Sequence, residues 1–482
     1  MKTFERRSSP AVLSISNSGS TPPLSLAVKR VLLPLACGFG SFYSVSGYTS
    51  ELSALINHTI DSNYQIISAR YDVNSSRYDK DISSAFFYPS INASANTTWN
   101  ESDVDSTTPS NNEYNSNGYR ISITQTILDL SRLDTYKESE IDLKISRLQH
   151  DKVVNDIVFE VVDNYFSYLK YHAQKKATDA QLKSSQSRLK QITRNHELGN
   201  LPKTDVYETQ AQKGTTSKQI TDIRKKISQA LNQLRSTTQT RISPSYDMAL
   251  TNQYSQIDES EKAALEKKLI SGNFEIAIAR SNLDRSKRTL SKSKSEFYPT
   301  LSASANYEYS DSNLDHSIQD TSTYALTLDV PIFEGGSDYY EYQKSKNTIQ
   351  QLSSRYDQSL NDTRVELDDT ILNINANIES LDILKSVIKS NYLVYTGNKK
   401  AYRLGTKTLT DLLNSESDLY DSIRDYHSNQ YDYIINTTKL YSLFGAIDLK
   451  AIEAISNSMV PINETFDMAA LEQFASGEMP NE

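Results

Sequence analysis

The chain of 482 residues contains an internal repeat, and this repeat limits the possible folds more than any other feature does. Three landmarks occur twice in the same order: a Tyr-Pro pair, a segment of alternating apolar and polar residues, and a Leu-Gly pair followed by five residues and an aspartate. Pro89 recurs as Pro299, 210 residues later (299 − 89), and Gly199 recurs as Gly405, 206 residues later (405 − 199). Such self-similarity indicates two tandem copies of one supersecondary unit.

Each copy contains two alternating segments that predict β-strands. They start near Ile91 and Ile121 in the first copy, and near Leu301 and Leu326 in the second. An alternation of period two over about ten residues is typical of a strand that spans a membrane with one face in lipid. An ordinary soluble hairpin with one buried face has the same pattern, so the strands alone leave both interpretations open.

Very long helices are predicted after each pair of strands, because proline and glycine are few, at 12 and 14 residues. Neither occurs from Arg132 to Leu198, and only Gly397 interrupts the stretch from Ser337 to Leu404. At roughly 1.5 Å per residue, each helix would reach about 100 Å. An apolar stripe spaced by three and four predicts coiled-coil packing of the second helix: Leu367, Ile371, Ile374, Ile378, Leu381, Ile388, Tyr392 and Tyr395.

The last helix carries a seven-residue apolar repeat that runs from Leu412 to Phe444. Polar residues occupy some positions of the same stripe, among them Glu416, Gln430 and Thr437. A polar residue on a packed stripe more often fixes the register of the helices than performs chemistry. We therefore expect these side chains to be structural, and the stripe itself to be helix-bundle core.

Composition excludes several classes of protein. The mean hydropathy of −0.56, with 23% charged residues, excludes a protein with many membrane-spanning helices. The net charge of −9 without a basic cluster argues against nucleic acid as a partner. No His-x3-His pair, phosphate-binding glycine loop or nucleophile-elbow pattern is present. The sequence therefore predicts no enzyme, no cofactor and no metal site.

The N-terminal 47 residues have the features of a secretory signal peptide. Lys29 and Arg30 precede an apolar stretch, Val31 to Val45, and a small residue, Gly47, follows it. Cleavage near Gly47 would leave the mature protein without cysteine, because Cys37 is the only one. A lipoprotein signal with Cys37 acylated is the rival interpretation, although Pro34 is unusual for it, and a buried apolar strand is a third.

At this point the sequence resembles the TolC-like outer membrane efflux proteins, over about residues 50 to 450. The most specific segments are Tyr-Arg-Leu-Gly-Thr-Lys-Thr-Leu-Thr-Asp-Leu-Leu at 402–413 and Leu-Thr-Leu-Asp-Val-Pro-Ile-Phe-Glu-Gly-Gly at 326–336. The first copy, Leu-Gly-Asn-Leu-Pro-Lys-Thr-Asp-Val at 198–206, matches less fully. Its strand end, Ile-Leu-Asp at 127–129, lacks the proline and the glycine pair of the second copy.

The resemblance implies a homotrimer in the outer membrane that extends into the periplasm. Each chain would give four strands to a 12-stranded membrane β-barrel and its long helices to a coiled-coil α-barrel, the periplasmic tunnel. The first repeat would span residues 48–241 and the second 273–450, with an irregular equatorial segment, 242–272, between them and a polar tail, 451–482. The implied function is a passive exit duct for efflux or type I secretion, joined by a periplasmic adaptor to an inner-membrane pump.

The resemblance also implies a closed periplasmic entrance at the two Leu-Gly turns. The gate contacts would join Thr204 and Asp205 to Tyr402 and Lys407, with both Lys407 and the Tyr402 hydroxyl directed at Asp205. A constriction ring would be formed by Asp411, with the neutral Asn414 at a second ring position. The adaptor would dock at the turns themselves, at Leu198, Gly199, Leu404 and Gly405. Plain turns with ordinary surface charges are the simpler alternative.

Two other functions remain open on the sequence. A soluble periplasmic coiled-coil scaffold or adaptor would explain the helices but not the paired alternating strands. A periplasmic enzyme would need a site that the sequence does not reveal. The cargo of a channel, whether drug, protein or metal ion, does not follow from these motifs.

Overall fold

The computed structural model describes residues 51–104, 110–241, 244, 246–248, 256–312, 317–445 and 459–461. The predicted signal peptide with Cys37 lies outside the described residues, as do most of the predicted tail at 451–482 and part of the segment 242–272. Within the described ranges, no helix combines the length and the apolar character needed to cross a membrane.

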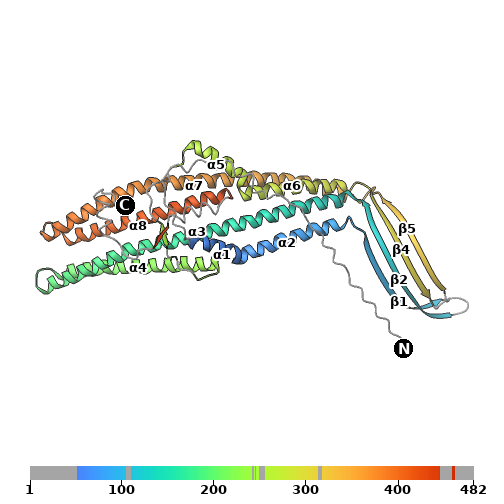
Figure 1. Cartoon of the computed structure of the whole chain (residues 1–482), viewed down its shortest axis with the longest axis horizontal. Coiled ribbons are helices and arrows are strands. Elements are labelled where there is room, and N and C mark those ends of the chain that lie inside the picture. Colours follow the sequence, from blue (N-terminus) through green and yellow to red (C-terminus); the bar gives the residue numbers. More distant parts are fainter. Residues whose placement is uncertain are drawn as a thin grey trace, which may run out of the picture. The chain divides into compact units, whose positions relative to one another are not determined.

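The elements of the two repeats follow one another in the same order (Figure 1). The first repeat consists of α1 (Glu51–Ser62), α2 (Tyr64–Ala85), β1 (Ser90–Val104), β2 (Ser110–Leu128), α3 (Leu130–Glu197) and α4 (Lys203–Thr238). The second consists of α5 (Glu259–Gly272), α6 (Phe274–Ser295), β4 (Thr300–Ser312), β5 (Ser317–Asp329), α7 (Ser337–Arg403) and α8 (Leu409–Leu443). The short strands β3 (Tyr246–Met248) and β6 (Met459–Pro461) pair with each other. The predicted strand pairs and long helices are present in both repeats.

Two local expectations were wrong. A single helix was predicted before each strand pair, but the structure has two, which meet at Asn63 and at Asn273. The segment 242–272 was expected to be irregular, but its second half is the helix α5, the counterpart of α1. A capping box between Asp258 and Glu261 starts this helix, because each side chain accepts a hydrogen bond from the other residue's backbone N–H.

The two asparagines explain why the helix pairs break where they do. The Asn63 side chain accepts from the backbone N–H groups of Gln65 and Ile66, and so begins α2. Its amide nitrogen donates to the Thr237 carbonyl near the end of α4, at 2.8 Å. Asn273 begins α6 in the same way and donates to the Leu443 carbonyl at the end of α8, at 3.0 Å. One side chain in each repeat therefore joins three helices.

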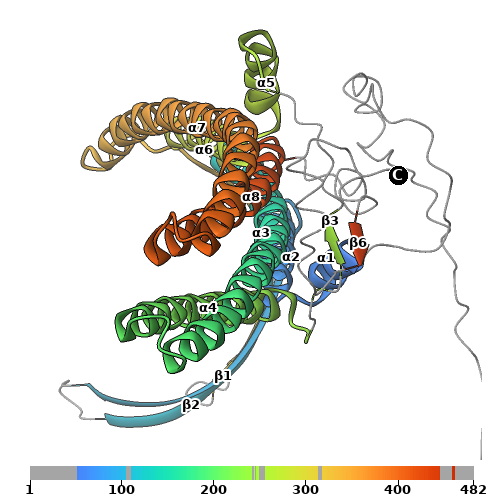
Figure 2. The same cartoon turned by 90° about the vertical axis from the view of Figure 1, so that its left-hand side faces the viewer.

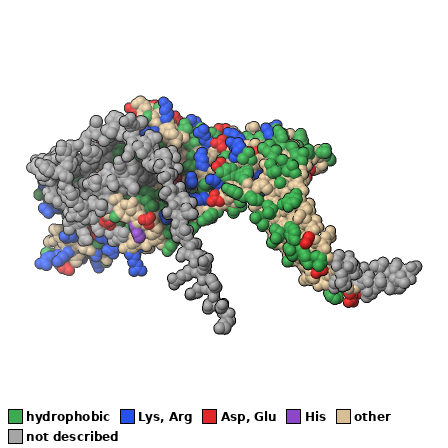
Figure 3. Space-filling model, turned by 45° about the vertical axis from the view of Figure 1, so that its right-hand side comes forward, with side chains coloured by type: hydrophobic (Ala, Val, Ile, Leu, Met, Phe, Trp, Pro, Cys, Tyr) green, Lys and Arg blue, Asp and Glu red, His purple; other side chains and the backbone are tan. Residues whose placement is uncertain are grey.

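The four longer strands form one antiparallel sheet in the order β1-β2-β4-β5. The two hairpins have the same register, since Ser94 pairs with Arg120 and Ser304 pairs with Ala325. Between the repeats, β2 pairs with β4, and Arg120 forms an ion pair of 2.7 Å with Glu308 opposite it. Hydrophobic side chains gather over the sheet and the adjacent helix ends, whereas charged side chains are spread over the helices (Figure 3). In the described part of the chain, the outer edges of β1 and β5 have no partner strand.

The helices pack in a repeating pattern. Within each repeat, the first half of the long helix contacts α2 or α6, and its second half forms a hairpin with α4 or α8. Between the repeats, α3 contacts both α6 and α8. Viewed from their far ends, the α3–α4 and α7–α8 pairs lie beside one another (Figure 2). The predicted stripe of α7 is buried against α8, with Leu367 and Leu381 fully buried, so the coiled-coil prediction is confirmed.

Candidate functional site

Both helical hairpins turn at a Leu-Gly pair with the same hydrogen bonds. After α3, Gly199 donates to the His196 carbonyl and Asn200 to the Asn195 carbonyl, both at 2.9 Å. After α7, Gly405 donates to the Tyr402 carbonyl at 3.1 Å, and Thr406 donates to the Ala401 carbonyl at 3.0 Å. This is the Schellman arrangement, which needs a left-handed residue after the helix end. Gly199 and Gly405 supply it, with φ of +79° and +75°.

The leucines of the two turns point into open space. Leu198 is 65% exposed and Leu404 is 80% exposed. No heavy atom lies within 4 Å of the place where a Cβ on Gly199 or Gly405 would stand. The glycines are therefore required for backbone conformation and not for lack of room. The predicted docking residues thus form two similar protruding turns, and their role in docking stays a prediction.

The helices that follow the turns begin differently. Thr408 caps α8 in a capping box, in which its hydroxyl accepts from the Asp411 N–H and the Asp411 carboxylate accepts from the Thr408 N–H. The Thr408 hydroxyl also donates to Asp411 at 2.8 Å. Pro202 stands at the corresponding place before α4 and offers no side-chain cap. The predicted ring residue Asp411 is thus first of all the cap of its own helix.

Asp411 is held in its charged form by these contacts. The hydrogen bond from the Thr408 side chain, followed by that from the Thr408 backbone, lowers the pKa of Asp411 from its ordinary value, and the Lys407 ammonium adds to this. Lys407 lies 3.9 Å from Asp411 within the chain, and no ion pair between Lys407 and Asp205 occurs among the described residues of this single chain. The predicted Lys407–Asp205 contact stays a prediction for the assembled entrance. Asn414 is exposed one turn further along α8.

Tyr402 and Asp205 are close enough to influence each other. Tyr402 lies in the last turn of α7, and its ring packs against the apolar cluster of Ile192, Leu409 and Leu413. Burial raises the pKa of the Tyr402 hydroxyl, and the negative charge of Asp205 raises it further. Asp205 lies in the first turn of α4, where its carboxylate accepts from the Thr204 hydroxyl at 3.4 Å. The structure thus brings Tyr402, Asp205 and Thr204 together at the hairpin ends, without a direct Tyr402–Asp205 hydrogen bond among the described contacts.

A direct link between the two hairpins was missed by the sequence analysis. The Thr410 hydroxyl of α8 donates to Glu208 of α4 at 2.7 Å. Thr410 is the counterpart of Thr204, and Glu208 is the counterpart of Asn414, 206 residues apart in each case (410 − 204 and 414 − 208). The offset of 206 residues between the repeats could have found this pair. It places Glu208 at the position that corresponds to the predicted ring residue Asn414.

Further from the turns, α3 and α8 are joined by buried charges. Arg188 forms an ion pair of 2.7 Å with Glu416, and their side chains are only 9% and 2% exposed. The Ser184 hydroxyl donates to the other oxygen of Glu416. Two turns of α8 later, Arg424 donates to Gln181 at 2.8 Å and pairs with Asp421. Glu416 therefore fixes the packing of α8 on α3, as a polar residue on a packed stripe was expected to do.

No chemistry other than packing and charge is evident at this end of the molecule. Within the residues that the structure describes, no group of three His, Cys, Asp or Glu side chains could hold a metal ion. The arrangement consists of two protruding turns, carboxylates at the starts of two helices, and a polar interface between the hairpins. Such a site suits contacts with other protein surfaces.

Comparisons with known proteins match both repeats of the chain. A family model described as outer membrane efflux protein matches residues 55–238 and 265–446, one match in each repeat. Outer membrane protein TolC of Escherichia coli is 22% identical over 374 residues, covering 71% of this chain and 75% of that protein. Alkaline protease secretion protein AprF of Pseudomonas aeruginosa is 20% identical over 354 residues, covering 72% of this chain and 73% of that protein.

Solved structures show the same fold. The CmeC outer membrane channel of Campylobacter jejuni matches with a TM-score of 0.74 and 15% identity, covering 95% of this chain and 99% of that one. The outer membrane protein VceC of Vibrio cholerae matches with a TM-score of 0.71 and 16% identity, covering 82% of this chain and 97% of that one. The fold that the resemblance implied is confirmed.

Proposed function

Since this chain belongs to the outer membrane efflux protein family and acts at the outer membrane, we propose that three copies form one passive exit duct. The duct receives cargo from an inner-membrane pump through a periplasmic adaptor, in efflux or in type I secretion. Type I secretion is supported by the match to a relative named for protease secretion. The chain is a transport channel subunit and not an enzyme.

The unpaired edges of the sheet carry this proposal. Four strands cannot close into a barrel, which needs about eight, and open edges are not tolerated in lipid. Alternate residues of the edge strand β5 are apolar and highly exposed: Tyr324, Leu326 and Leu328 are 82%, 69% and 62% exposed. Three copies joined edge to edge would give twelve strands, remove every open edge and place these side chains in lipid.

The assembly is tested first. Unheated protein from an outer-membrane fraction should migrate as a trimer in SDS gels and as a monomer after boiling. The purified trimer should conduct ions in planar lipid bilayers. Monomeric protein in the periplasmic fraction, without conductance, would favour the soluble scaffold instead.

The protruding turns are proposed to dock the adaptor. Leu198 and Leu404 are exposed apolar side chains at quasi-equivalent places, so a trimer would present six of them at one end. The bulky variant Gly405→Trp should abolish transport while trimers remain in the outer membrane. Gly405→Ala is its control, because it has the same backbone strain without the bulk. Wild-type transport by Gly405→Trp would argue against docking.

The hairpin ends are proposed to close the entrance. Asp205, with Thr204 beside it, would hold Tyr402 and Lys407 of the neighbouring hairpin. Because lysine lacks the two-pronged geometry of arginine, the closure is a weak one, about 0–1 kcal/mol for each partly exposed pair. The double variant Asp205→Ala with Lys407→Ala should raise the conductance of a correctly folded trimer. An unchanged conductance would remove the gate assignment and leave the channel function intact.

Asp411 is proposed to form the constriction ring of three carboxylates. Asn414 is neutral, so cation selectivity should depend mainly on Asp411. Asp411→Ala should therefore weaken the block of conductance by multivalent cations. Asp362→Ala, on α7 far from the hairpin ends, should leave that block unchanged.

A further inference from the structure

A groove of about 340 Å³ lies between α3 and α6. Its lining consists of two side chains from α3 and four from α6, each set at the spacing that places side chains on one face of a helix: Ile141, Lys144, Ser281, Asp284, Lys287 and Arg288. The volume is at the small end of the range for ligand pockets, about 300–1,000 Å³. Both walls belong to one chain, so the groove does not depend on a second copy.

The groove is basic, and most of its charge is unpaired. Lys144, Lys287 and Arg288 supply three positive charges against the single carboxylate of Asp284, which leaves an excess of two. Asp284 accepts a hydrogen bond of 2.9 Å from Lys287. Within the described part of the chain, Lys144 and Arg288 are exposed and take part in no ion pair. Two cations therefore line the groove without a partner of opposite charge.

The wall of the groove also offers a hydroxyl group. Ser281 is only 2% exposed. Other buried serines of α6 donate to a carbonyl of their own helix, as Ser286 does to Leu283 and Ser293 to Thr289. The Ser281 hydroxyl has no such bond among the described residues. It is therefore available as a donor to a bound group.

The charge of the groove is not repeated in the other half of the chain. The counterpart of Lys144 on α7 is the neutral Gln350, 206 positions later, and the counterpart of Arg288 on α2 is Tyr78, 210 positions earlier. Over their whole lengths, α6 has six cations and two carboxylates, whereas α2 has three of each. The excess of cations is thus specific to this place and does not follow from the repeated fold.

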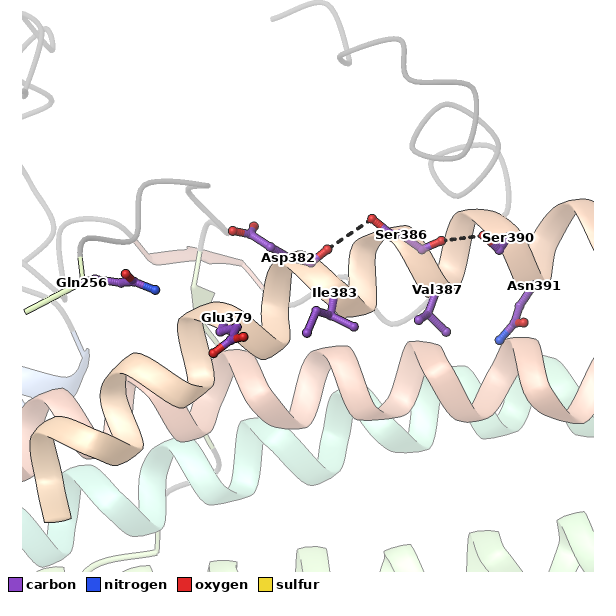
Figure 4. Close-up of a pocket in the computed structure, with 8 residues that line it drawn as sticks. All are labelled: Gln256, Glu379, Asp382, Ile383, Ser386, Val387, Ser390 and Asn391. Carbon is purple, nitrogen blue, oxygen red and sulfur yellow. Dashed lines mark hydrogen bonds between the residues drawn. The ribbon is translucent and has the colours of Figure 1, made fainter.

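A larger groove, of about 690 Å³, has the opposite charge (Figure 4). It lies on α7, and Gln256 of the segment before α5 lines it too. Its charged lining residues are the carboxylates Glu379 and Asp382. An anion would be repelled from the α7 groove and attracted to the groove between α3 and α6.

The basic groove opens on the outer side of the helices. The helices α7, α8, α3 and α4 follow an arc, and α1 and α5 lie on its convex side (Figure 2). Val162 of α3 is buried in one cluster with Leu52 and Leu55 of α1. Lys144 precedes Val162 by 18 residues (162 − 144), which is about five turns, so both side chains lie on the same side of α3. In a closed ring, the convex side is the outer surface.

The groove also lies close to the sheet. Arg288 precedes Ser295, the last residue of α6, by seven residues, or about 10 Å. Lys144 follows Leu130, the first residue of α3, by 14 residues, or about 21 Å. With the sheet in the outer membrane, the groove would lie just inside the periplasm. Both lipid headgroups and soluble molecules would reach it there.

We propose that this groove binds a phosphomonoester group through Lys144, Arg288 and the Ser281 hydroxyl. Such a group has a charge of about −1.5 to −2 at pH 7 and three strong acceptor oxygens. The charge matches the excess of two positive charges in the groove, and lysine and arginine form charge-assisted hydrogen bonds with phosphate oxygens. A carboxylate or a phosphodiester has only one negative charge and matches less well. The proposal uses the proposed function only to place the groove beneath the outer membrane.

The purified full-length trimer tests the site through its melting temperature, because a ligand that binds the folded state raises it. Inorganic phosphate should raise the melting temperature above that in chloride at the same ionic strength. Lys144→Gln combined with Arg288→Gln should weaken this binding by about tenfold. Each protein is compared with its own melting temperature in chloride, so a loss of stability does not resemble a loss of binding.

Two further variants show whether the effect belongs to the groove. Lys218→Gln combined with Lys225→Gln is the matched control, because it removes the same charge from exposed positions of α4. This control should keep the full shift. Asp284→Asn removes the only carboxylate of the groove and should strengthen phosphate binding by about two- to fivefold. A gain of affinity is not expected if these residues have only a structural role.

The two sources of a phosphomonoester are separated in phosphatidylcholine nanodiscs. Phosphatidic acid, a phosphomonoester, is compared there with phosphatidylglycerol, a phosphodiester. A larger shift with phosphatidic acid that the groove variant loses would support the proposal and assign a lipid ligand. A shift with inorganic phosphate alone, lost in the same variant, would support it and assign a soluble ligand.

Three results would overturn the proposal: equal phosphate shifts in the groove variant and the control, no shift with either phosphate or phosphatidic acid, or equal effects of the two lipids. Failure of the wild-type chain to form a conducting trimer would count against the proposed function instead. The groove could then be measured on the monomer, since both of its walls lie in one chain.

Discussion

The helices α3 and α7 have almost the same length, 68 and 67 residues, and the same place in their repeats. They differ in one face: Phe166, Ala177 and Gln181 of α3 are buried, whereas their counterparts 206 positions later, Leu372, Ile383 and Val387 of α7, are exposed. That of α3 is buried under α8 and contains two ion pairs with α8, whereas that of α7 is exposed and mostly aliphatic. The comparison teaches that the interface inside the chain tolerates buried charge where each charge has a partner of opposite sign. The matching face of α7 buries no charge, because its one charged residue, Glu379, is exposed.

The largest difference in stability between variants of α3 and α7 should appear when one partner of the buried Arg188–Glu416 ion pair is removed. Arg188→Ala leaves Glu416 buried without its cation, which costs about 3–5 kcal/mol per chain. Val394→Ala, at the counterpart position of α7, leaves no buried charge and should cost much less. Thermal unfolding of the detergent-solubilised protein, followed by circular dichroism, measures both. Equal losses for the two variants would contradict the comparison.

The two helix junctions at Asn63 and Asn273 have the same contacts, so equivalent substitutions there should lower stability equally. Asn63→Ala and Asn273→Ala each remove a helix cap, at about 0.5–2 kcal/mol, and each also frees a carbonyl at the end of α4 or α8. The two melting temperatures should fall by similar amounts. A loss confined to one variant would show that the two junctions are not equivalent in energy.

Glycine-to-alanine substitutions should change the free energy of unfolding in opposite directions at the turns and inside α7. Gly199→Ala and Gly405→Ala force a side chain into a left-handed conformation, at a cost of about 1 kcal/mol each. Gly397 lies inside α7, where no heavy atom stands within 4 Å of the place that a Cβ would occupy. Gly397→Ala should therefore stabilise the protein by about 0.5–1 kcal/mol. Chemical unfolding of the three variants under one set of conditions measures these changes. A change of the same sign in all three would contradict this account.

The smallest expected effect concerns the starts of α4 and α8 at low pH. The pKa of Asp411 is lowered below its ordinary value of 3.8, so its contribution to stability is present above about pH 4. That contribution is lost as the pH falls through the lower pKa of the folded state. Hydrogen exchange at the first turn of α8 should therefore rise on acidification more than at the first turn of α4, which has no side-chain cap. In Asp411→Asn this difference should vanish, and its persistence would rule out Asp411 as the cause.

The sequence predicted the elements well because the repeat, the strand alternation and the breaker-free helices are all local patterns. The stripe of Leu367 to Tyr395 was predicted correctly for the same reason. The break at Asn63 was not, since an asparagine inside a helical stretch is an ordinary residue until its amide is seen on the Thr237 carbonyl. The exposed apolar residues of α7, Leu372, Ala376, Ile383 and Val387, are also periodic. Their exposure could not be predicted, because the corresponding residues of α3 are not exposed.

The site was predictable in its position and less so in its contacts. The Leu-Gly pairs located both turns because a left-handed glycine ends a helix in a recognisable way. Within the single chain Lys407 lies near Asp411, four residues further along. Its expected contact with Asp205 stays a prediction for the assembled entrance. The partner of Glu416 could not be named, since nothing in the sequence of α3 distinguishes Arg188 from its other basic residues.

The tandem repeat also lowers the entropic cost of assembly. A ring of six separate units would need five association steps, and each step loses translational and rotational freedom estimated at 4–15 kcal/mol or more. When one chain carries two units, a trimer needs only two such steps. The joint between α3 and α8 forms within the chain, at an effective concentration in roughly the millimolar range for short connections. Half of the six joints can therefore be complete, with their buried charges already paired, before one copy of the chain meets another.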